Sequence, residues 1–397
     1  MSSPAKSVWI IVAVLITMLC GQAAMATEKE SEHTHYLRLG GQWGTVLESN
    51  DFVAGDNASG EKIDEYQSLR LEFGWQTDGN EDWHHLYNFP SYGIGIYSCE
   101  YANGDELGNP TSLYGFFSWP AKRWSRSSLN VDFAFGLTDN WVGFDPETNP
   151  YNTAMGAGSS VIIDFGANFE FPLSRRFWLQ AGFTATHFSN GGSQQPNFGI
   201  NQVGGIAYVK YDLQERNIPS QTRPLAPFTP SWEMNLTFMG GGRNLALDLR
   251  DQTDDLSAYY TKDYFVGNMV FMTSKQFGRM SKYTFGLDVG YDESVSDRAI
   301  VDGLINETNP EEIDFIDKFS LGGVAGYEHV VHRASLIVHL GYTFFQKTLP
   351  NSLPRFYQRL GLRYHFWQDL YAGLNVRFHE FSRADNLEFN VGYRWTP

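Results

Sequence analysis

The sequence predicts an all-β protein, a closed transmembrane antiparallel β-barrel of the outer-membrane type with about sixteen strands. Segments of about ten residues alternate apolar and polar side chains between turn-forming residues, which is the pattern of a barrel strand. Aromatic residues make up 16% of the chain and glycines number 39, whereas a helical apolar period is sustained nowhere. The N-terminus also has the features of an export signal.

The first 26 residues have the pattern of a cleavable signal peptide. Lys6 supplies a positive charge, residues 8–19 are apolar, and Ala24-Met25-Ala26 fits the small-residue cleavage site. This apolar run is shorter than the roughly 20 residues that a membrane-spanning helix needs, and no other run approaches that length. We therefore expect residues 1–26 to be removed and residues 27–397 to form the barrel.

Composition and charge narrow the function. The formal net charge of -16 argues against binding to nucleic acid. It leaves an anionic lipid open as a partner, because divalent cations can bridge like charges. Once the signal is removed, Cys99 is the one remaining cysteine, which excludes an intrachain disulfide and a cysteine-based metal cluster. We expect no cofactor and no bound metal, and we leave a homodimer open.

Sixteen candidate strands follow from the alternation. The last places Leu387, Val391 and Trp395 on one row and ends almost at the C-terminus, as the closing strand of a barrel should. Strands 91–101, 111–118 and 260–275 are the least regular, so twelve or fourteen strands stay alternatives. The candidates are 35–47, 66–76, 91–101, 111–118, 127–137, 158–169, 175–189, 201–213, 230–243, 260–275, 281–292, 317–330, 333–346, 355–366, 369–381 and 385–396.

Loop lengths suggest how the strands are oriented. With a periplasmic N-terminus, long polar gaps such as 293–314 fall on the outer side and tight turns on the periplasmic side, as in known barrels. The gaps 77–90 and 214–229 break this rule, and the second could be a linker between two eight-stranded halves. We nevertheless predict one closed barrel in which strands 35–47 and 385–396 pair.

One strand carries a histidine and a serine on its apolar row. The row through Phe183 and Ala185 continues to His187 and Ser189, because residues i and i+2 of a strand share a face. Lone polar groups that face hydrocarbon are costly and tend to mark function. A base beside a hydroxyl nucleophile on an apolar surface indicates chemistry on a lipid. The residues expected to face inward are Arg176, Gln180, Thr184 and Thr186.

A longer pattern surrounds this pair. It reads His-x-Ser-Asn, a short loop, and then Pro-Asn-x-Gly-Ile, at His187, Ser189, Asn190, Pro196, Asn197, Gly199 and Ile200. The pattern resembles the PagL-type lipid A 3-O-deacylases, also called acyloxyacyl-hydrolase-like proteins. The resemblance covers residues 91–213 and leaves 214–397 unmatched. It implies an eight-stranded outer-membrane barrel that removes an ester-linked acyl chain from lipid A, the anchor of lipopolysaccharide.

The resemblance also implies a catalytic serine, histidine and glutamate. Ser189 is then the nucleophile and His187 the base, while the glutamate position falls on Asn201, a departure from the family. An asparagine can orient the imidazole through its amide oxygen but supplies no charge. The expected oxyanion hole is formed by Asn190, Gly191 and Gly192, and the loop is supported by Pro196, Asn197 and Gly199.

Two other functions stay open: a non-enzymatic channel, and an outer-membrane esterase or acyltransferase that acts on phospholipid. Asp145, Asn149 and Asn152 precede the sixth strand and could hold a divalent cation or a lipid A headgroup, or could structure their own loop through Asx turns. His84 and His85 lie beside Asp82 in a turn, where a structural role is favoured over metal binding. Residues on inward rows either line a pore or fill a polar lumen: Arg359, Arg363, His365, Arg377 and His379.

Overall fold

The computed structural model describes residues 34–216, 218–219, 221–250, 258–350, 352–381 and 383–396. The expected signal peptide lies outside these residues. The described chain divides into two compact units, one ending at Leu225 and one beginning at Ala226, with residues 191–195 grouped with the second. Each unit is a closed antiparallel barrel of eight strands, which confirms the all-β class and the count of sixteen.

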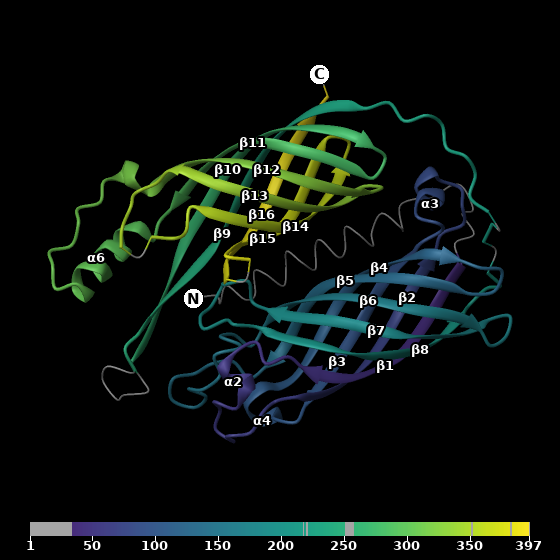
Figure 1. The fold of residues 1–397 in the computed structure, drawn as a ribbon, viewed down its shortest axis with the longest axis horizontal. Helices are drawn as coiled ribbons and strands as arrows, with labels where there is room; N and C mark the ends of the chain where they lie inside the picture. The colour runs from purple at the N-terminus through teal and green to yellow at the C-terminus, as the bar shows by residue number, and fades with distance from the viewer. Residues whose placement is uncertain are drawn as a thin grey trace. The chain divides into compact units, whose positions relative to one another are not determined.

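The first barrel contains the first eight strands in sequence order (Figure 1). Each strand pairs with its neighbours in the chain, and β1 closes the circuit by pairing with β8, Tyr36 opposite Asp212. The strands are β1 (Thr34–Val46), β2 (Glu65–Gln76), β3 (Ser91–Tyr101), β4 (Gly108–Arg123), β5 (Ser128–Trp141), β6 (Ser160–Pro172), β7 (Phe177–Ser189) and β8 (Ile200–Asp212).

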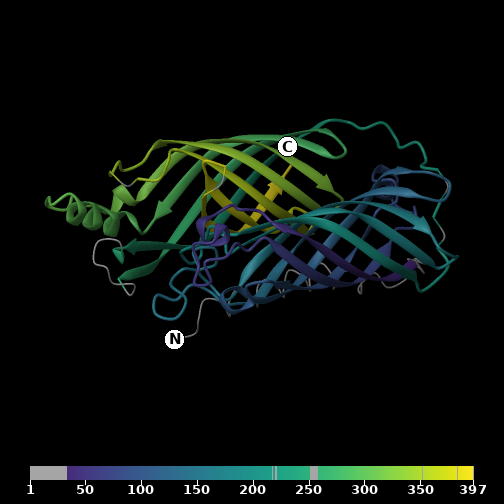
Figure 2. The same cartoon turned by 60° about the horizontal axis from the view of Figure 1, so that its bottom comes forward.

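The second barrel repeats this plan with the last eight strands (Figure 2). It closes between its first and last strands, with Trp395 opposite Met234. The strands are β9 (Ser231–Asp248), β10 (Tyr259–Gly278), β11 (Ser281–Asp292), β12 (Phe319–Val331), β13 (Ala334–Phe345), β14 (Phe356–Trp367), β15 (Leu370–His379) and β16 (Arg383–Trp395).

The prediction of one closed barrel is therefore wrong. The first strand of the chain pairs with the eighth and the last with the ninth, so the gap 214–229 connects two barrels. Alternation tells which face of a strand is apolar, but it does not tell which strand completes the circuit. The irregular fourth strand is longer than predicted because register shifts at Gly108/Thr111 and Pro120/Lys122 interrupt its alternation.

Ion pairs fill the interior of the first barrel. An eight-stranded barrel is only wide enough for its own side chains, so inward charges must find partners within it. Arg38 contacts Glu72 and donates to Asp132 at 3.1 Å. Arg70 donates two hydrogen bonds to the Asp164 carboxylate, at 2.7 and 3.0 Å.

The second barrel is filled in the same way. Arg359 donates to Glu388 at 2.6 Å and pairs with Asp288 at 2.8 Å. Arg363 donates to Glu328 at 3.2 Å. Arg359 and Arg363 therefore fill a polar lumen. Of the two roles that the sequence left open for them, this is the second, and lining a pore is the first.

The outer faces of the strands are apolar. On β1, Leu37, Leu39 and Trp43 are exposed, and on β7 Phe183 is 78% exposed, the reverse of a soluble core. Large apolar side chains exposed in rows of this kind mark a surface that contacts an apolar environment. Among the described residues, no helix has the length and apolar character to cross a membrane.

Short helices occupy the ends of the first barrel. α2 (Asp51–Ala54) and α4 (Gly104–Leu107) lie at one end and α3 (Asp82–Leu86) at the other (Figure 1). α3 accounts for the unexpectedly long gap 77–90. There His84 Nδ1 accepts from Gly79 N at 3.1 Å and His85 Nε2 contacts Gly79 O at 2.7 Å, so both histidines hold the turn together, as the structural interpretation predicted.

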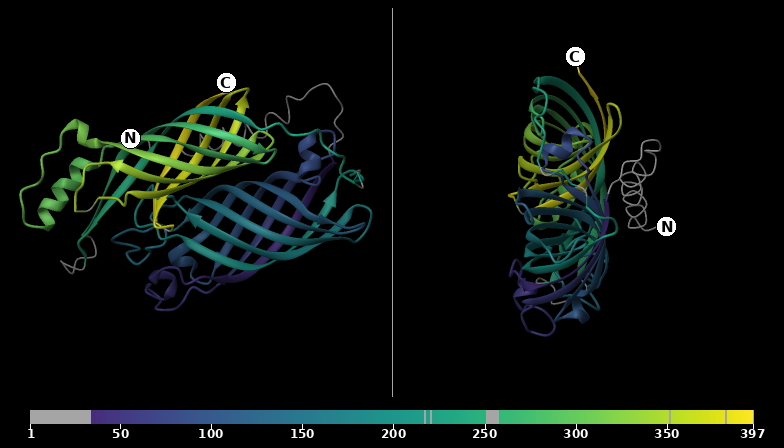
Figure 3. Two further views of the ribbon diagram at one scale, coloured as in Figure 1. Left: turned by 45° about the horizontal axis from the view of Figure 1, so that its top comes forward. Right: turned by 90° about the vertical axis from the view of Figure 1, so that its right-hand side faces the viewer.

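In the second barrel the longest connection contains α6 (Val295–Ile305) and the 3₁₀-helix η1 (Phe315–Lys318). Both lie between β11 and β12, at the end of this barrel where β11 finishes, and α6 extends beyond the strand ends (Figure 3). This is the gap 293–314, whose length and polarity set it apart in the sequence.

Candidate active site

The end of β7 carries the histidine and serine, and residues 183–186 before them have the predicted facing, whereas Arg176, which was predicted to face inward, is exposed just before β7 begins. Phe183 and Ala185 are exposed on the outer row. Thr184 and Thr186 point inward, where their hydroxyls donate to Asp164 at 2.7 and 2.6 Å. Strand alternation places His187 and Ser189 on the row of Phe183 and Ala185.

Asn201 lies directly opposite His187 across the β7–β8 ladder. Its amide oxygen lies 2.7 Å from His187 Nδ1, so the predicted contact is confirmed. Because an amide oxygen can only accept, Nδ1 carries the proton and Nε2 is left as the acceptor. The imidazole is thus fixed in the tautomer that a general base requires.

Two further hydrogen bonds hold Asn201 in place. Its Nδ2 donates to Ser49 Oγ at 3.0 Å, and its backbone oxygen accepts from Leu47 N at 2.8 Å. Ser49 and Leu47 follow β1, which reaches the start of β8 only because the first barrel closes between these two strands. The orientation of the histidine therefore depends on barrel closure.

Ser189 is held by the loop that follows it. Asn197 Nδ2 donates to Ser189 Oγ at 2.9 Å, and Asn197 Oδ1 accepts from Asn190 N at 2.9 Å. One asparagine side chain thus bridges both ends of the loop and fixes the hydroxyl of Ser189, a residue that is only 6% exposed. The sequence pattern predicts loop support for Asn197, and its contact with the serine was not predicted.

The backbone of Gly199 lies close to both catalytic candidates, His187 and Ser189. Its φ of +74° lies in the left-handed region, which strongly favours glycine. A Cβ at this position would lie 3.1 Å from His187 Cε1 and 3.7 Å from Ser189 Cβ. The backbone there is held by Asn50 Nδ2, which donates to Gly199 O at 2.9 Å, and by Gly199 N, which donates to Ala154 O at 2.9 Å.

The expected oxyanion donors lie at the start of the same loop. Gly191 and Gly192 both have positive φ, +65° and +81°, so the chain turns sharply just after Ser189 and Asn190. The backbone N–H of Asn190 already donates a hydrogen bond to Asn197 Oδ1. Asn197 Nδ2 donates to Ser189 Oγ, a role that the sequence did not predict for it.

The loop between β5 and β6 structures itself. Asp145 Oδ1 accepts from Thr148 N at 2.8 Å, Thr148 Oγ1 at 2.9 Å and Glu147 N at 3.0 Å, which forms an Asx turn. These hydrogen bonds, those from Thr148 first, lower the pKa of the Asp145 carboxyl. In the described ranges, no group of three or more histidine, cysteine, aspartate or glutamate side chains is placed to hold a metal ion.

The two asparagines of that loop also bind backbone. Asn152 Nδ2 donates to Val142 O at 2.7 Å and Asn149 Nδ2 to Glu106 O at 3.0 Å. Their contacts match the loop-structuring alternative. The loop also supports the site, because the backbone oxygens of Thr153 and Ala154 accept hydrogen bonds from the backbone N–H groups of residues 198 and 199.

Comparison with known protein families gives two adjoining matches. Residues 67–210 match the family described as lipid A 3-O-deacylase (PagL), and residues 232–397 match the family described as acyloxyacyl hydrolase, C-terminal domain. The first match spans most of the first barrel. The second covers nearly all of the second barrel, which the sequence motif at residues 187–200 does not reach. None of the curated proteins compared matches this chain.

Among solved structures, the outer membrane enzyme PagL is 15% identical, over 43% of this chain and 97% of that one, with a TM-score of 0.30. The translocator domain of the autotransporter NalP from Neisseria meningitidis is 9% identical, over 99% of both chains, with a TM-score of 0.22. A porin of Rhodopseudomonas blastica is 8% identical, over 91% of this chain and 99% of that one, with a TM-score of 0.16.

Proposed function

We propose that this chain, whose residues 67–210 match the lipid A 3-O-deacylase (PagL) family and whose residues 232–397 match the acyloxyacyl hydrolase C-terminal domain, uses Ser189 and His187 to hydrolyse an ester-linked acyl chain of lipid A. The family is one of hydrolases. The serine mechanism, the residues and the substrate contacts are our proposal. The observation that carries it is the 2.7 Å contact from Asn201 to His187 Nδ1, beside a serine held by Asn197.

The chemistry begins with proton transfer. Nε2 of His187 accepts the proton of Ser189 Oγ as that oxygen attacks the ester carbonyl, because a serine hydroxyl is a weak nucleophile without a base. Asn201 keeps the imidazole in the required tautomer. The imidazolium then gives its proton to the sugar oxygen that leaves. In the second half of the reaction, His187 takes a proton from the water that attacks the acyl-serine and returns it to Ser189 Oγ, which releases the fatty acid.

The tetrahedral intermediate carries a negative oxygen that needs donors. Asn197 Nδ2, which already lies 2.9 Å from Ser189 Oγ, is one candidate. The others are the backbone N–H groups of Gly191 and Gly192, which follow directly in the chain, and the Asn190 side chain. Removal of one such donor typically lowers kcat by about 10²–10³-fold.

The position of the site suits a lipid substrate. The row that leads to Ser189 is the outward, apolar one, and Phe183 on it is 78% exposed. With the export signal cleaved at residue 26 and a periplasmic N-terminus, β7 runs outward and ends in the outer leaflet, where lipid A resides. An acyl chain can then lie along the outer row while its ester reaches the rim.

Release of fatty acid from lipid A by the purified protein in detergent tests this function. The wild type should release fatty acid, whereas Ser189→Ala and His187→Ala should fall to the background rate. All three should keep the heat-sensitive gel mobility of a folded barrel, because both residues lie at the rim. Parallel assays with phospholipid vesicles distinguish the alternative esterase: equal or faster release from phospholipid would reject lipid A as the preferred substrate.

A further inference from the structure

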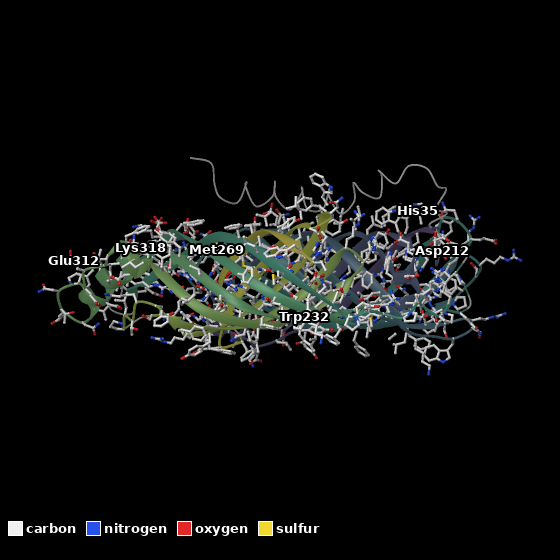
Figure 4. The ribbon with its side chains drawn as sticks, turned by 90° about the horizontal axis from the view of Figure 1, so that it is seen from above. His35, Asp212, Trp232, Met269, Glu312 and Lys318 are labelled. Atoms are coloured by element: carbon white, nitrogen blue, oxygen red, sulfur yellow. The ribbon has the colours of Figure 1, made fainter. Side chains whose placement is uncertain are left out.

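The second barrel contains a polar cavity at one end. Its volume is about 70 Å³, and it lies where β11 and β13 finish, beneath α6 and η1. Lys318 at its rim is at the end of this barrel opposite Trp232 (Figure 4). A single water needs about 10–15 Å³ of such space, so the cavity can admit a small tetrahedral ion.

Positive charge is concentrated around this cavity. Five cationic side chains and two carboxylates line it, an excess of three positive charges in a protein whose net charge is -16. The cations are Arg243, Arg298, Lys318, Lys347 and Arg377, and the carboxylates are Asp292 and Asp317.

Two of the five cations are neutralised by near carboxylates. Arg243 donates to Asp292 at 2.5 Å and to Asp385 at 2.6 and 2.7 Å. Lys347 pairs at 2.9 Å with Glu311 and at 3.3 Å with Asp317. These pairs use both carboxylates of the lining.

The remaining three cations have less compensation. Arg377 Nε lies 3.8 Å from Asp385, a carboxylate already shared with Arg243, and makes no hydrogen bond to a described residue. Lys318 and Arg298 have no carboxylate within 4.0 Å in the described part of the chain.

Arg298 is the most informative of the three. It projects from α6 and is only 8% exposed, yet its Nη2 is buried with no hydrogen-bond partner among the described residues. A buried guanidinium without partners is costly, and native structures rarely keep one unless a ligand or ion completes it. Burial first, and then the neighbouring Arg243, lower the pKa of Arg298, and the nearby Asp292 and Asp385 offset this only in part.

We infer that this cavity binds a phosphate group, held by Arg298 and Arg377 with Lys318 at the rim. Guanidinium groups bind phosphate through paired N–H donors, and a lysine adds a point charge. Ser320, Thr343 and Asn268 line the same space and can donate to the remaining phosphate oxygens. The phosphate can come from a phosphorylated lipid headgroup or from free inorganic phosphate, and the chemistry of recognition is the same.

Calorimetric titration of the full-length protein with sodium phosphate, at constant ionic strength in chloride, tests the inference. Wild type should bind phosphate. Arg298→Gln should weaken binding about 10-fold or more, because hydrogen bonds to charged groups are the strong ones. Lys318→Gln, at the accessible rim, should weaken it less and serves if Arg298→Gln does not fold. The matched control is Arg333→Gln, an exposed arginine in the turn at the opposite end of the same barrel, which should leave binding unchanged.

Nanodiscs that contain lipid A with or without its phosphates separate the two sources. Preferential binding to the phosphorylated form identifies a headgroup site, and binding of inorganic phosphate alone identifies a site for the free ion; either result supports the inference. Ser189→Ala should bind as wild type does, so this inference and the proposed catalysis fail separately. No heat of phosphate binding in wild type, or equal affinity in Arg298→Gln and Arg333→Gln, would overturn it.

Discussion

Replacement of Gly199 by alanine should impair catalysis far more than folding. A Cβ at Gly199 would lie 2.8 Å from Phe188 O and 3.1 Å from His187 Cε1, so the imidazole or the loop must shift. The φ of +74° adds about 1–2 kcal/mol of strain for a residue with a side chain. A displacement of a catalytic group by about 1 Å can lower a rate by about 10²-fold. We expect the rate of fatty acid release to fall about 10- to 100-fold.

Gly60 offers a matched control for the backbone strain. It has nearly the same φ, +69°, but no described atom lies within 4 Å of a Cβ built there. Gly60→Ala should therefore lose the same 1–2 kcal/mol or so of unfolding free energy and keep the wild-type rate. Denaturant unfolding and fatty acid release would be measured on both variants.

The comparison of these two variants has a clear failing outcome. If Gly199→Ala unfolds as Gly60→Ala does and also retains the wild-type rate, the position of the imidazole over Gly199 has no catalytic meaning. Loss of activity in both variants to the same extent would point to loop stability as the cause.

Three further predictions concern the orienter, the lumen and the two-barrel architecture. Asn201→Ala should lower the deacylation rate less than His187→Ala does, and Asn201→Glu should keep or raise it, since a carboxylate orients the imidazole and also stabilises its charge; an inactive Asn201→Glu would contradict this role. Arg70→Met should cost about 3–5 kcal/mol of unfolding free energy by leaving Asp164 buried without its cation, and the added change Asp164→Leu should recover most of it; denaturant titration would show whether it does. A protease site inserted within 217–225 should yield two fragments that each keep heat-sensitive gel mobility after cleavage, whereas a fragment that unfolds on cleavage would argue against two self-sufficient barrels.

Local features of the fold could be predicted from the sequence with good accuracy, because strand alternation is a local property. Strands β1, β3 and β11 begin and end within one residue of their expected positions. β4 was shortened in the prediction because its register shifts break the alternation. The number of barrels was predicted wrongly, because the alternation of β8 shows which of its faces is apolar but does not show that it pairs with β1.

The site followed the same division between local and distant information. His187 and Asn201 could be placed together because one loop joins their strands, and the contact has the predicted partners. Ser49 and Asn50 could not be found, since each lies about 150 residues from its partner and meets it only through closure of the first barrel. The sequence left Asp145, Asn149 and Asn152 between two roles, because Asx turns and cation sites use the same residue types.

The central claim is that Ser189 removes an acyl chain from lipid A, and the mass of lipid A after incubation with the protein tests it most directly. Wild-type protein should convert lipid A to a species lighter by one ester-linked acyl chain, and Ser189→Ala protein that migrates as a folded barrel should leave the mass unchanged. Conversion by Ser189→Ala at the wild-type rate would contradict the claim, as would intact lipid A after incubation with the wild type.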